Sequence, residues 1–498
     1  IIKNIIIKIK LKLFDLIDSG LNAPYNEVIK ALLLGERSKL PEDWKEVFSL
    51  SGANHLLAIS GLHISFILLV LIKLSSIYNK IPDSLKNIVI SFILIFYLLL
   101  TGIRSSVFRA ALLSIFYLWG RYLNKETDIY NILAITAILN LMINPYALFQ
   151  VAFQLTYLVL IMILLWHSIL EKIFPKVLSV SIAAQFGSLA ISAYYFNIIS
   201  PIGIFTNLWA IPLSGLIIII SFISLMLGII FPIIHNILCQ LIEFLLLIMK
   251  NAMEISSNLA IGHFEIASPS IIEVYIIYLL LIISPFILKK RAVPILIRRN
   301  IKIKRYYIFI LIVIILFNFL YMPQKDLKII FFSVGQGDSI LIKSPKGKNV
   351  LIDGGGLASK NYDQGEKVLI PYLKSEGIKK LDFAVITHFD TDHALGITTL
   401  LKEKRVKTIL LAINHYENYL SKKTYDLAQE NNIKIHKLKR GDIIKEGELR
   451  FMILHPYLKS DYKVKNRNNN SIVIKVVYKN FSLLLTGDLE KEGELRLL

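Results

Sequence analysis

The segment Ile386–Gly396, ITHFDTDHALG, places two histidines and two aspartates within six positions. His388, Asp390, Asp392 and His393 follow DFAVIT, an apolar run typical of a strand. Imidazole and carboxylate groups together suit zinc, manganese or iron. Neighbouring side chains point in different directions and so can serve two ions, which activate water for hydrolysis. A solvated turn rich in Asp and His is the alternative, and this density of ligands after a strand disfavours it.

Two further aspartates close apolar runs. Asp488 ends LLLTGD and stands where a carboxylate can bridge two metal ions. Asp353 ends the strand-like run NVLID, just before three glycines. We expect Asp353 to support the metal-binding loop from behind the ligands. A plain turn aspartate remains the alternative at both positions.

The elements that must position these residues fall into two halves. The 498 residues are 55% hydrophobic and carry a formal net charge of +20, with a mean hydropathy of +0.60. This composition excludes an ordinary soluble protein and favours partners such as nucleic acid or anionic lipid. The single Cys239 excludes an internal disulfide. Apolar runs dominate up to Met322, and short alternating runs typical of strands follow.

The first half is predicted to be a polytopic membrane domain. Its apolar runs approach the roughly 20 residues that a membrane-spanning helix requires. The predicted spans are Leu56–Ile77, Asn87–Ile103, Val107–Leu123, Tyr130–Ile143, Leu148–Leu170, Leu178–Ile199, Ile202–Ile230, Ile233–Leu259, Ile271–Leu288 and Tyr306–Met322. Residues 1–54 are expected to form amphipathic helices on the outer membrane surface, one of them beginning at Pro41. Ile233–Leu259 contains several polar residues, so a surface position is the alternative there.

Charge predicts the orientation. The loop Lys289–Arg305 holds eight basic residues and no acidic one, which places it in the cytoplasm by the positive-inside tendency. Tyr306–Met322 then crosses once, so residues 324–498 lie outside the cytoplasm. This second half carries 30 Lys and Arg against 21 Asp and Glu, and its positive charge favours binding of nucleic acid. A solubilising surface or contact with lipid headgroups explains the charge equally well.

Several motifs resemble known families. VGQGDSILI, LIDGGG, THFDTDH, NNNSIVI and LLTGD occur in the order found in the metallo-β-lactamase fold. In the first half, GANHLLAISGLHISF, TGIRSSVFRAALL, NPYALFQVAFQLTYL and TNLWAIPL resemble the ComEC-type competence proteins. The resemblance covers almost the whole chain. It implies a multi-pass protein of the cell (inner) membrane that imports single-stranded DNA, followed by an extracytoplasmic αββα sandwich at residues 324–498.

The resemblance also implies a metal site. Its ligands would be His388, Asp390, Asp392, His393 and Asp488, with Asp392 and His388 catalytic and with Asp353 and Asp338 supporting them. The bound cofactor would be a divalent metal, Mn²⁺ or Zn²⁺. Cutting of the discarded strand by metal-activated water would then be the reaction.

Three departures qualify this prediction. Asp390 replaces a histidine of the usual fold, which favours harder, oxygen-preferring ions such as manganese. The region NRNNNS has no histidine where the usual fold has one, and the family's final histidine pair does not follow Asp488. The domain is therefore expected to be truncated at its C-terminus, with two ions bound only if the missing ligand is present. An OB-type domain, frequent in the family, does not precede Asn26 in this sequence.

Polar residues in the membrane half are candidates for the DNA path, because polar groups in lipid are costly unless they face a cavity. They are His55, Ser60, His63, Arg104, Arg109, Gln154 and Asn207. The helix-breaking Pro212 is expected to interrupt a helix beside this path. For each residue, packing between helices or contact with lipid headgroups is the alternative.

The function predicted from the whole sequence is a DNA-uptake channel with a nuclease domain. Its expected partners are single- and double-stranded DNA, membrane lipid, a DNA receptor, a cytoplasmic motor and a second copy in a homodimer. A transporter whose outer domain binds DNA without cutting is one alternative. A membrane-anchored metallohydrolase for another anionic ester is the other.

Overall fold

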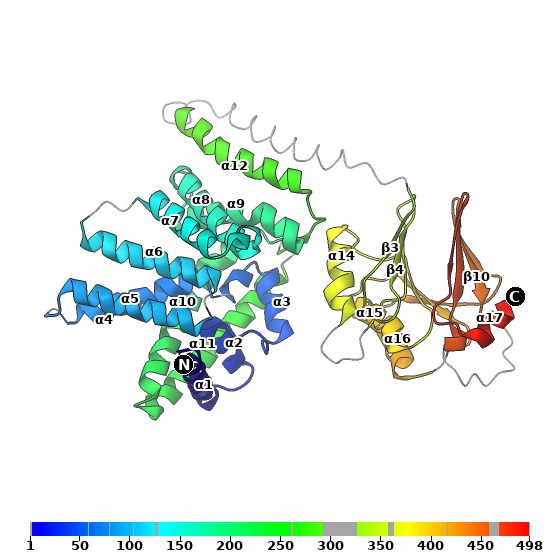
Figure 1. Ribbon diagram of the computed structural model, residues 1–498, viewed down its shortest axis with the longest axis horizontal. Helices are drawn as coiled ribbons and strands as arrows, with labels where there is room; N and C mark the ends of the chain where they lie inside the picture. Colours follow the sequence, from blue (N-terminus) through cyan, green and yellow to red (C-terminus); the bar gives the residue numbers. More distant parts are fainter. Residues whose placement is uncertain are drawn as a thin grey trace. The chain divides into compact units, whose positions relative to one another are not determined.

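The computed structural model describes residues 2–57, 59–78, 80–102, 104–124, 128–259, 262–291, 326–356, 363–415, 417–457 and 468–497. The chain forms two compact units, Ile1–Pro294 and Ile295–Leu498. Helices make up most of the first unit, and two larger sheets with helices make up the second (Figure 1). The predicted boundary at Pro323 lies outside the described residues, and the one at residue 54 stays a prediction.

Helices form wherever the first unit has apolar runs. They are α1 (Ile2–Gly20), α2 (Tyr25–Leu34), α3 (Glu42–Leu50), η1 (Asn54–Leu56), α4 (Gly61–Ser76), α5 (Asp83–Leu100), α6 (Ser105–Tyr122), α7 (Ile129–Ile143), η2 (Pro145–Phe149), α8 (Val151–Leu170), α9 (Lys176–Phe196), α10 (Gly203–Gly228), α11 (Pro232–Ser257) and α12 (Ile271–Arg291). Strands β1 (Ile198–Ile199) and β2 (Phe264–Glu265) pair antiparallel. Among the described residues, the five helices α5, α8, α9, α10 and α11 have the length and composition of membrane spans, which suits a multi-pass membrane protein. The predicted span Tyr306–Met322 lies outside the described residues.

Two predicted spans begin later than expected. Leu56–Ile77 becomes helical only at Gly61, because Ser60 is extended and caps the helix together with His63. Leu148–Leu170 becomes an α-helix only at Val151, because residues up to Phe149 form η2. Apolar composition alone does not reveal such breaks.

Two further expectations were wrong. Pro212 does not interrupt its helix, since α10 continues through it. A proline removes one backbone donor, and packing inside a bundle tolerates that loss. The helix α2 does not lie on a surface, because every residue from Val28 to Leu34 is buried. It shares a core with α4, α10 and α11. The predicted helix start after Pro41 is confirmed by α3.

Helices α8 and α9 approach closely at Gly187. A Cβ atom at this position would lie 2.5 Å from Val159 Cα. Gly187→Ala is therefore expected to destabilise the first unit by about 1–3 kcal/mol, because backbone must move to admit the methyl group. Thermal unfolding in detergent would measure the loss. Gly61→Ala is the matched control, since its Cβ would meet only Ala110 at 3.7 Å. Equal melting temperatures for the two variants would contradict this account.

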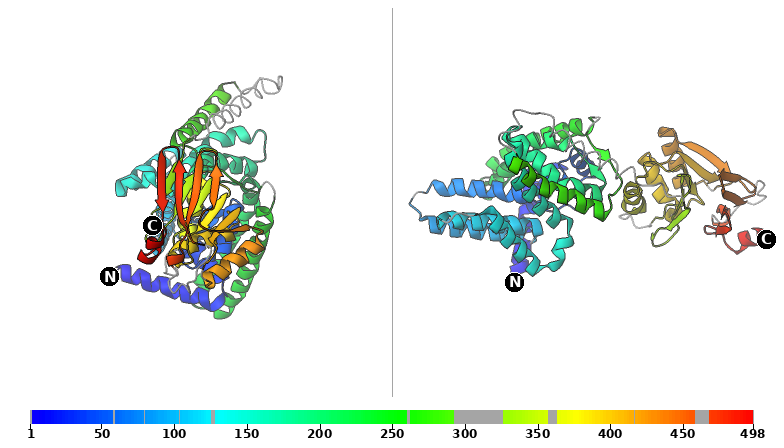
Figure 2. Two further views of the ribbon diagram at one scale, coloured as in Figure 1. Left: turned by 90° about the vertical axis from the view of Figure 1, so that its right-hand side faces the viewer. Right: turned by 90° about the horizontal axis from the view of Figure 1, so that it is seen from above.

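The second unit contains two sheets. Strands β3 (Lys328–Phe331), β4 (Ile340–Lys343), β5 (Asn349–Ile352), β6 (Phe383–Ile386), β7 (Thr408–Ala412) and β8 (Lys434–Leu438) form the first sheet in this order, with β5 to β8 parallel. Strands β9 (Ile443–Glu446), β10 (Leu449–His455), β11 (Val473–Tyr478) and β12 (Phe481–Leu485) form the antiparallel second sheet. Figure 2 shows these four strands side by side in its left view. The remaining elements are η3 (Gly365–Leu369), α14 (Ile370–Ser375), α15 (Thr391–Lys402), α16 (Tyr419–Glu430), η4 (Asn468–Asn470) and α17 (Lys491–Leu497).

Side-chain alternation along the strands creates two cores. On β4, Leu341 faces the core shared with α14, α15 and α16. Its neighbours Ile340 and Ile342 face the core between the two sheets. The helices therefore cover one face of the first sheet, as Figure 1 shows, and the second sheet covers the other. This helix–sheet–sheet layering corresponds to three of the four layers of the predicted αββα sandwich.

Candidate metal centre

The first sheet brings the predicted ligands to one edge. Strand β6 ends at Ile386, and the loop that carries His388 leads into α15. Asp353 follows β5, the parallel neighbour of β6. The carboxyl ends of parallel strands share an edge, so these residues meet there. Asp488 comes from the second sheet, on the turn after β12.

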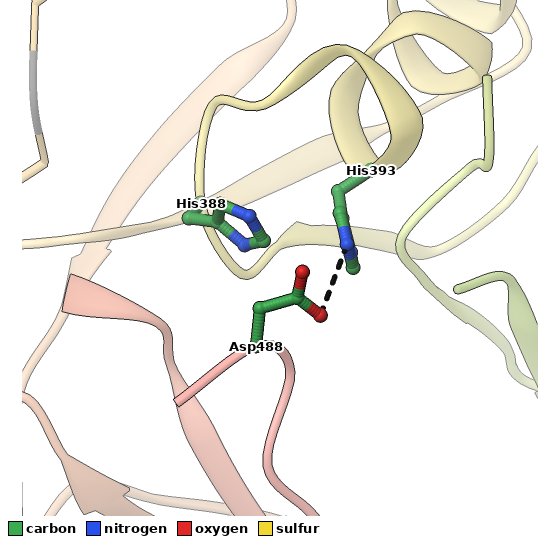
Figure 3. A group of neighbouring side chains, drawn as sticks. All are labelled: His388, His393 and Asp488. Carbon is green, nitrogen blue, oxygen red and sulfur yellow. Dashed lines mark ion pairs between the residues drawn. The ribbon is translucent and has the colours of Figure 1, made fainter. Parts of the chain in front are cut away.

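Three side chains converge at this edge. Figure 3 shows His388, His393 and Asp488 facing one another from the loop, from α15 and from the β12 turn. One ligand atom from each lies within 4.8 Å of the others. The Nε2 atom of His393 lies 3.2 Å from Oδ1 of Asp488. Both imidazoles are buried, with ring centroids 4.2 Å apart, while the Asp488 side chain is 43% exposed. A ligand that reaches this group therefore meets it from the Asp488 side.

Asp353 organises both histidines. Its buried carboxylate accepts hydrogen bonds from the Thr387 amide at 2.8 Å and from the Thr387 hydroxyl at 2.7 Å. It also accepts one from Nδ1 of His393 at 2.9 Å. Because the Thr387 hydroxyl proton goes to Asp353, its oxygen is left to accept from Nδ1 of His388, 3.1 Å away. One carboxylate thus fixes the Nδ1–H form of both rings.

This arrangement leaves the Nε2 lone pairs for a ligand. Both Nε2 atoms are buried. That of His388 has no hydrogen-bond partner among the described residues, and that of His393 has only the ion pair with Asp488 at 3.2 Å. Buried nitrogen atoms in this state are costly unless something binds them. Two imidazole nitrogens and a carboxylate are a donor set that a divalent metal ion accepts. The residues therefore fit the metal that the sequence predicts.

The pKa values of the two histidines shift in opposite directions. Burial lowers the pKa of His393, but the hydrogen bond to Asp353 and the charges of Asp353 and Asp488 outweigh this effect and raise it to about 9. Burial, together with the positive charge of His393, lowers the pKa of His388. Burial and the charge of Asp353 raise the pKa of Asp338. Without metal, His393 is the cation that pairs with Asp488, and a metal ion would have to displace its proton.

The other predicted ligands have different positions. Asp390 Oδ2 lies 3.8 Å from Nε2 of His388, at the start of α15. Asp392 is half-buried in the first turn of α15 and belongs to neither ligand group found among the described residues. Asp338 forms a second group with Asp353 and His393. The roles of Asp390, Asp392 and Asp338 remain predictions.

Glycines let the supporting loops pack against α15. A Cβ at Gly337 would lie 2.0 Å from the carbonyl oxygen of Asp392. A Cβ at Gly396 would lie 2.0 Å from the carbonyl oxygen of Gly354. Backbone contact at this distance admits no side chain. The GQGD and DGGG motifs are therefore needed to bring Asp353 and Asp338 up to the metal-binding loop.

The asparagine run does not supply an imidazole. Asn469 and Asn470 are buried in η4, and Asn469 Oδ1 accepts from the Glu490 amide at 3.3 Å. His455 is buried, and its Nδ1 donates a hydrogen bond to the Ser471 carbonyl at 2.8 Å. The Ser471 hydroxyl lies 3.3 Å from Nδ1 of His388. This segment thus supports the orientation of His388.

A neighbouring cavity was not predicted. Glu417, Asn418, Ser421, Lys422 and Tyr425 line a volume of about 380 Å³. The Asn418 amide donates to the carbonyl of Phe389, in the metal-binding loop, at 2.7 Å. The only sequence signal was position, since this segment follows the next parallel strand, β7, and so reaches the same sheet edge.

The predicted path residues occupy varied environments. Arg109 is buried, donates to the Ala152 carbonyl and the Thr156 hydroxyl, and lies over two aromatic rings of α8. These contacts join α6 to α8. They match the alternative to a role in the DNA path, which was packing between helices. Gln154 Nε2 donates to the Leu148 carbonyl at 3.1 Å, and the Asn207 side-chain oxygen is buried without a hydrogen-bond partner in the described part of the chain.

The remaining path residues lie at the start of α4 or on loops. Ser60 and His63 cap that helix, His55 is exposed in η1, and Arg104 donates to the Gly35 carbonyl. Nothing in these contacts tests whether DNA passes them.

Comparison with known proteins covers both units. The family model described as "Competence protein" matches residues 32–291, and that of the metallo-beta-lactamase superfamily matches residues 333–498. "ComE operon protein 3" of Bacillus subtilis (strain 168) is 28% identical over 94% of this chain and 61% of its own length. "Recombination protein 2" of Haemophilus influenzae is 27% identical over 93% of this chain and 61% of its own length.

The chain thus spans about 61% of the length of these curated relatives. A solved metallo-beta-lactamase fold protein, YhfI from Bacillus subtilis, matches with a TM-score of 0.22 and 16% identity over 30% of this chain and 55% of its own. That likeness is too low to carry an argument. The first family model alone accounts for more than half of the chain. The chain belongs to the competence protein family, with a C-terminal unit of the metallo-beta-lactamase superfamily.

Proposed function

We propose that this chain imports single-stranded DNA across the cell membrane during natural transformation. Its C-terminal unit is a metal-dependent nuclease that degrades the strand left outside. The observation that supports the nuclease is the convergence of the buried Nε2 atoms of His388 and His393 on Asp488, with ligand atoms within 4.8 Å of one another. Membership of the competence protein family supports DNA uptake.

The chemistry divides between the metal and the protein. A bound divalent ion would supply an acidified water and neutralise charge on the phosphate. His388, His393 and Asp488 would hold the ion, and Asp390, whose Oδ2 lies 3.8 Å from His388 Nε2, would add an oxygen ligand. Asp353 fixes the histidine tautomers. Asp392 and His388 remain the residues that we assign to catalysis.

Location follows from the same proposal. The helices span the inner membrane, and the nuclease unit lies on its outer side, where its excess of basic residues attracts single- and double-stranded DNA. A DNA receptor would deliver the duplex and a cytoplasmic motor would draw in one strand. Homodimers are compatible with this arrangement.

A transporter that binds DNA without cutting it is the second candidate. It is favoured by Asn468–Asn470, which stand where the usual fold places a histidine. Amides are weak metal ligands, so one ion of a pair would be poorly held.

The deciding experiment measures cleavage of labelled single- and double-stranded DNA by the full chain in detergent, with Mn²⁺ and with Zn²⁺. We expect Asp488→Asn to lower the rate by more than about 100-fold, since loss even of an outer partner of a ligand typically costs 10–100-fold. Asp426→Asn, an exposed change on α16, is the control. Binding without cleavage under every condition would favour the second candidate.

A further inference from the structure

Two arginines meet in the first unit, on loops far apart in the sequence. Arg37 follows α2, and its Nε donates to the Leu57 carbonyl at 3.0 Å. Arg104 precedes α6, and its Nη2 donates to the Gly35 carbonyl. A Cβ at Gly35 would lie 2.9 Å from the centre of the Arg104 guanidinium. The Arg104 guanidinium thus packs against the turn that leads from α2 to Arg37.

His63 adds a third hydrogen-bond donor. The Ser60 amide donates to Nδ1 of His63 at 3.2 Å, and the Ser60 hydroxyl lies 3.0 Å from the same atom. Since Nδ1 accepts, a neutral ring carries its proton on Nε2. His63 is fully buried, and its Nε2 has no hydrogen-bond partner among the described residues. The same holds for Nη2 of Arg37. Both are donors that lack an acceptor.

Charge makes the arrangement costlier. The charges of Arg37 and Arg104 lie close enough to interact, and Arg37 also lies close to His63. Glu36 is the nearby acid: its carboxylate accepts from the Ser38 hydroxyl, lies 3.7 Å from Lys10 and also interacts with the positive charge of Arg104. Glu36 therefore offsets part of the charge of Arg104, whereas the guanidinium of Arg37 faces the like charge of Arg104, which disfavours the folded state.

Other enclosed cations of this unit are satisfied. Lys30 is buried but lies 2.6 Å from Asp18 and 3.1 Å from Glu27. Arg109 has a carbonyl, a hydroxyl and two aromatic rings around it. The group formed by Arg37, His63 and Arg104 is here called the arginine–histidine cluster. Its Arg37 Nη2 and His63 Nε2 atoms are buried and have no hydrogen-bond partner in the described part of the chain.

We propose that the arginine–histidine cluster binds a phosphodiester group of the DNA strand that passes through the first unit. The inference rests on the proposed uptake function and adds Arg37, which the sequence motifs did not single out. Guanidinium groups match phosphate oxygens in a forked geometry. An imidazole N–H supplies a further donor to the same anion. Both arginines also hold backbone carbonyls, so the phosphate contact is made by groups that are already positioned.

Uptake of labelled DNA into nuclease-protected form tests this proposal. The full chain would be expressed in a transformable host that lacks its own homologue, with membrane levels matched by immunoblot. We expect Arg37→Gln to lower uptake on the order of tenfold, through loss of a charge-assisted contact. Arg37→Lys should recover part of it. Arg121→Gln removes an exposed cation at the end of α6 and should have no effect.

Donor DNA with a block of methylphosphonate linkages tests the wild-type chain, so no variant has to fold. Because the modified DNA has an uncharged backbone, the wild type should take it up more slowly than charged DNA. The difference between the two donors should be smaller for Arg37→Gln. Equal uptake by wild type and Arg37→Gln, or equal uptake of charged and neutral donors, would overturn the proposal. Failure of the wild type to import any DNA would refute the uptake function itself.

Lipid headgroups are the other source of phosphate. The purified chain would be heated in nanodiscs of phosphatidylcholine alone and of phosphatidylcholine with phosphatidylglycerol. Stabilisation of the wild type by phosphatidylglycerol, absent in Arg37→Gln, would assign the site to lipid and overturn its assignment to DNA. Equal melting in both lipids, together with the uptake defect, would support the assignment to DNA.

Discussion

Asp353→Asn is expected to abolish metal binding at physiological metal concentrations while leaving the fold assembled. Asparagine keeps the oxygen that accepts from the Thr387 amide. Its NH₂ group, however, faces Nδ1 of His393, where the native carboxylate accepts a hydrogen bond. The imidazole must then accept at Nδ1 and carry its proton on Nε2, the atom that faces Asp488. A ring in this tautomer cannot ligate a metal ion through Nε2.

The same substitution reaches His388 through Thr387. The native hydroxyl donates to Asp353 and so accepts from His388. An amide NH₂ beside that hydroxyl reverses its direction, which removes the preference of His388 for the Nδ1–H form. Loss of a partner that orients a single ligand typically costs 10–100-fold in affinity. Because Asp353 orients two ligands, we expect the metal affinity to fall by a factor at or above the upper end of that range.

Calorimetric titration with Mn²⁺ and Zn²⁺ would measure this loss, alongside DNA cleavage. Asp426→Asn on α16 makes the same chemical change at an exposed site and serves as the control. Circular dichroism would verify that the variant is folded. A variant that binds metal as tightly as the wild type would show that Asp353 does not set the tautomers.

Much of the metal centre was accessible from sequence because its residues follow strands. His388, His393 and Asp488 lie together, and their role as metal ligands stays a prediction. The loop after β6 leads to both histidines, whereas Asp488 lies on the turn after β12 of the antiparallel sheet. The link from Asp353 through Thr387 to His388 was not predicted. Threonine at the end of a strand is common, and only the direction of a hydroxyl proton gives Thr387 its role.

The membrane half shows a different limit. Hydropathy located the helices but not their first residues, as at Gly61 and Val151. Burial was also misjudged, because the pattern of α2 looks amphipathic although the helix lies within the core. An amphipathic pattern reports which face is apolar, and it does not report whether other helices cover the polar face. Arg37 was also missed, because the groups around it lie on loops distant in the sequence.

Asp390→His is expected to change which metal the centre prefers. In the native chain the side chain beside His388 Nε2 is a carboxylate, with Oδ2 at 3.8 Å. Carboxylate oxygens suit manganese, whereas imidazole nitrogens suit zinc. The aspartate makes no hydrogen bond that caps α15, so its replacement should leave the start of the helix intact. The variant tests ligand chemistry without breaking the loop.

We expect Asp390→His to raise the affinity for Zn²⁺ relative to Mn²⁺ by on the order of tenfold or more, since it adds a third imidazole. An ion that binds only the folded state raises its stability, by about 2.7 kcal/mol at 100 times its dissociation constant. Melting curves recorded over a series of each metal therefore report both affinities without relying on catalysis. Asp426→His is the control for an added surface histidine. An unchanged ratio of affinities would mean that Asp390 is not a ligand, and the centre would then consist of His388, His393 and Asp488 alone.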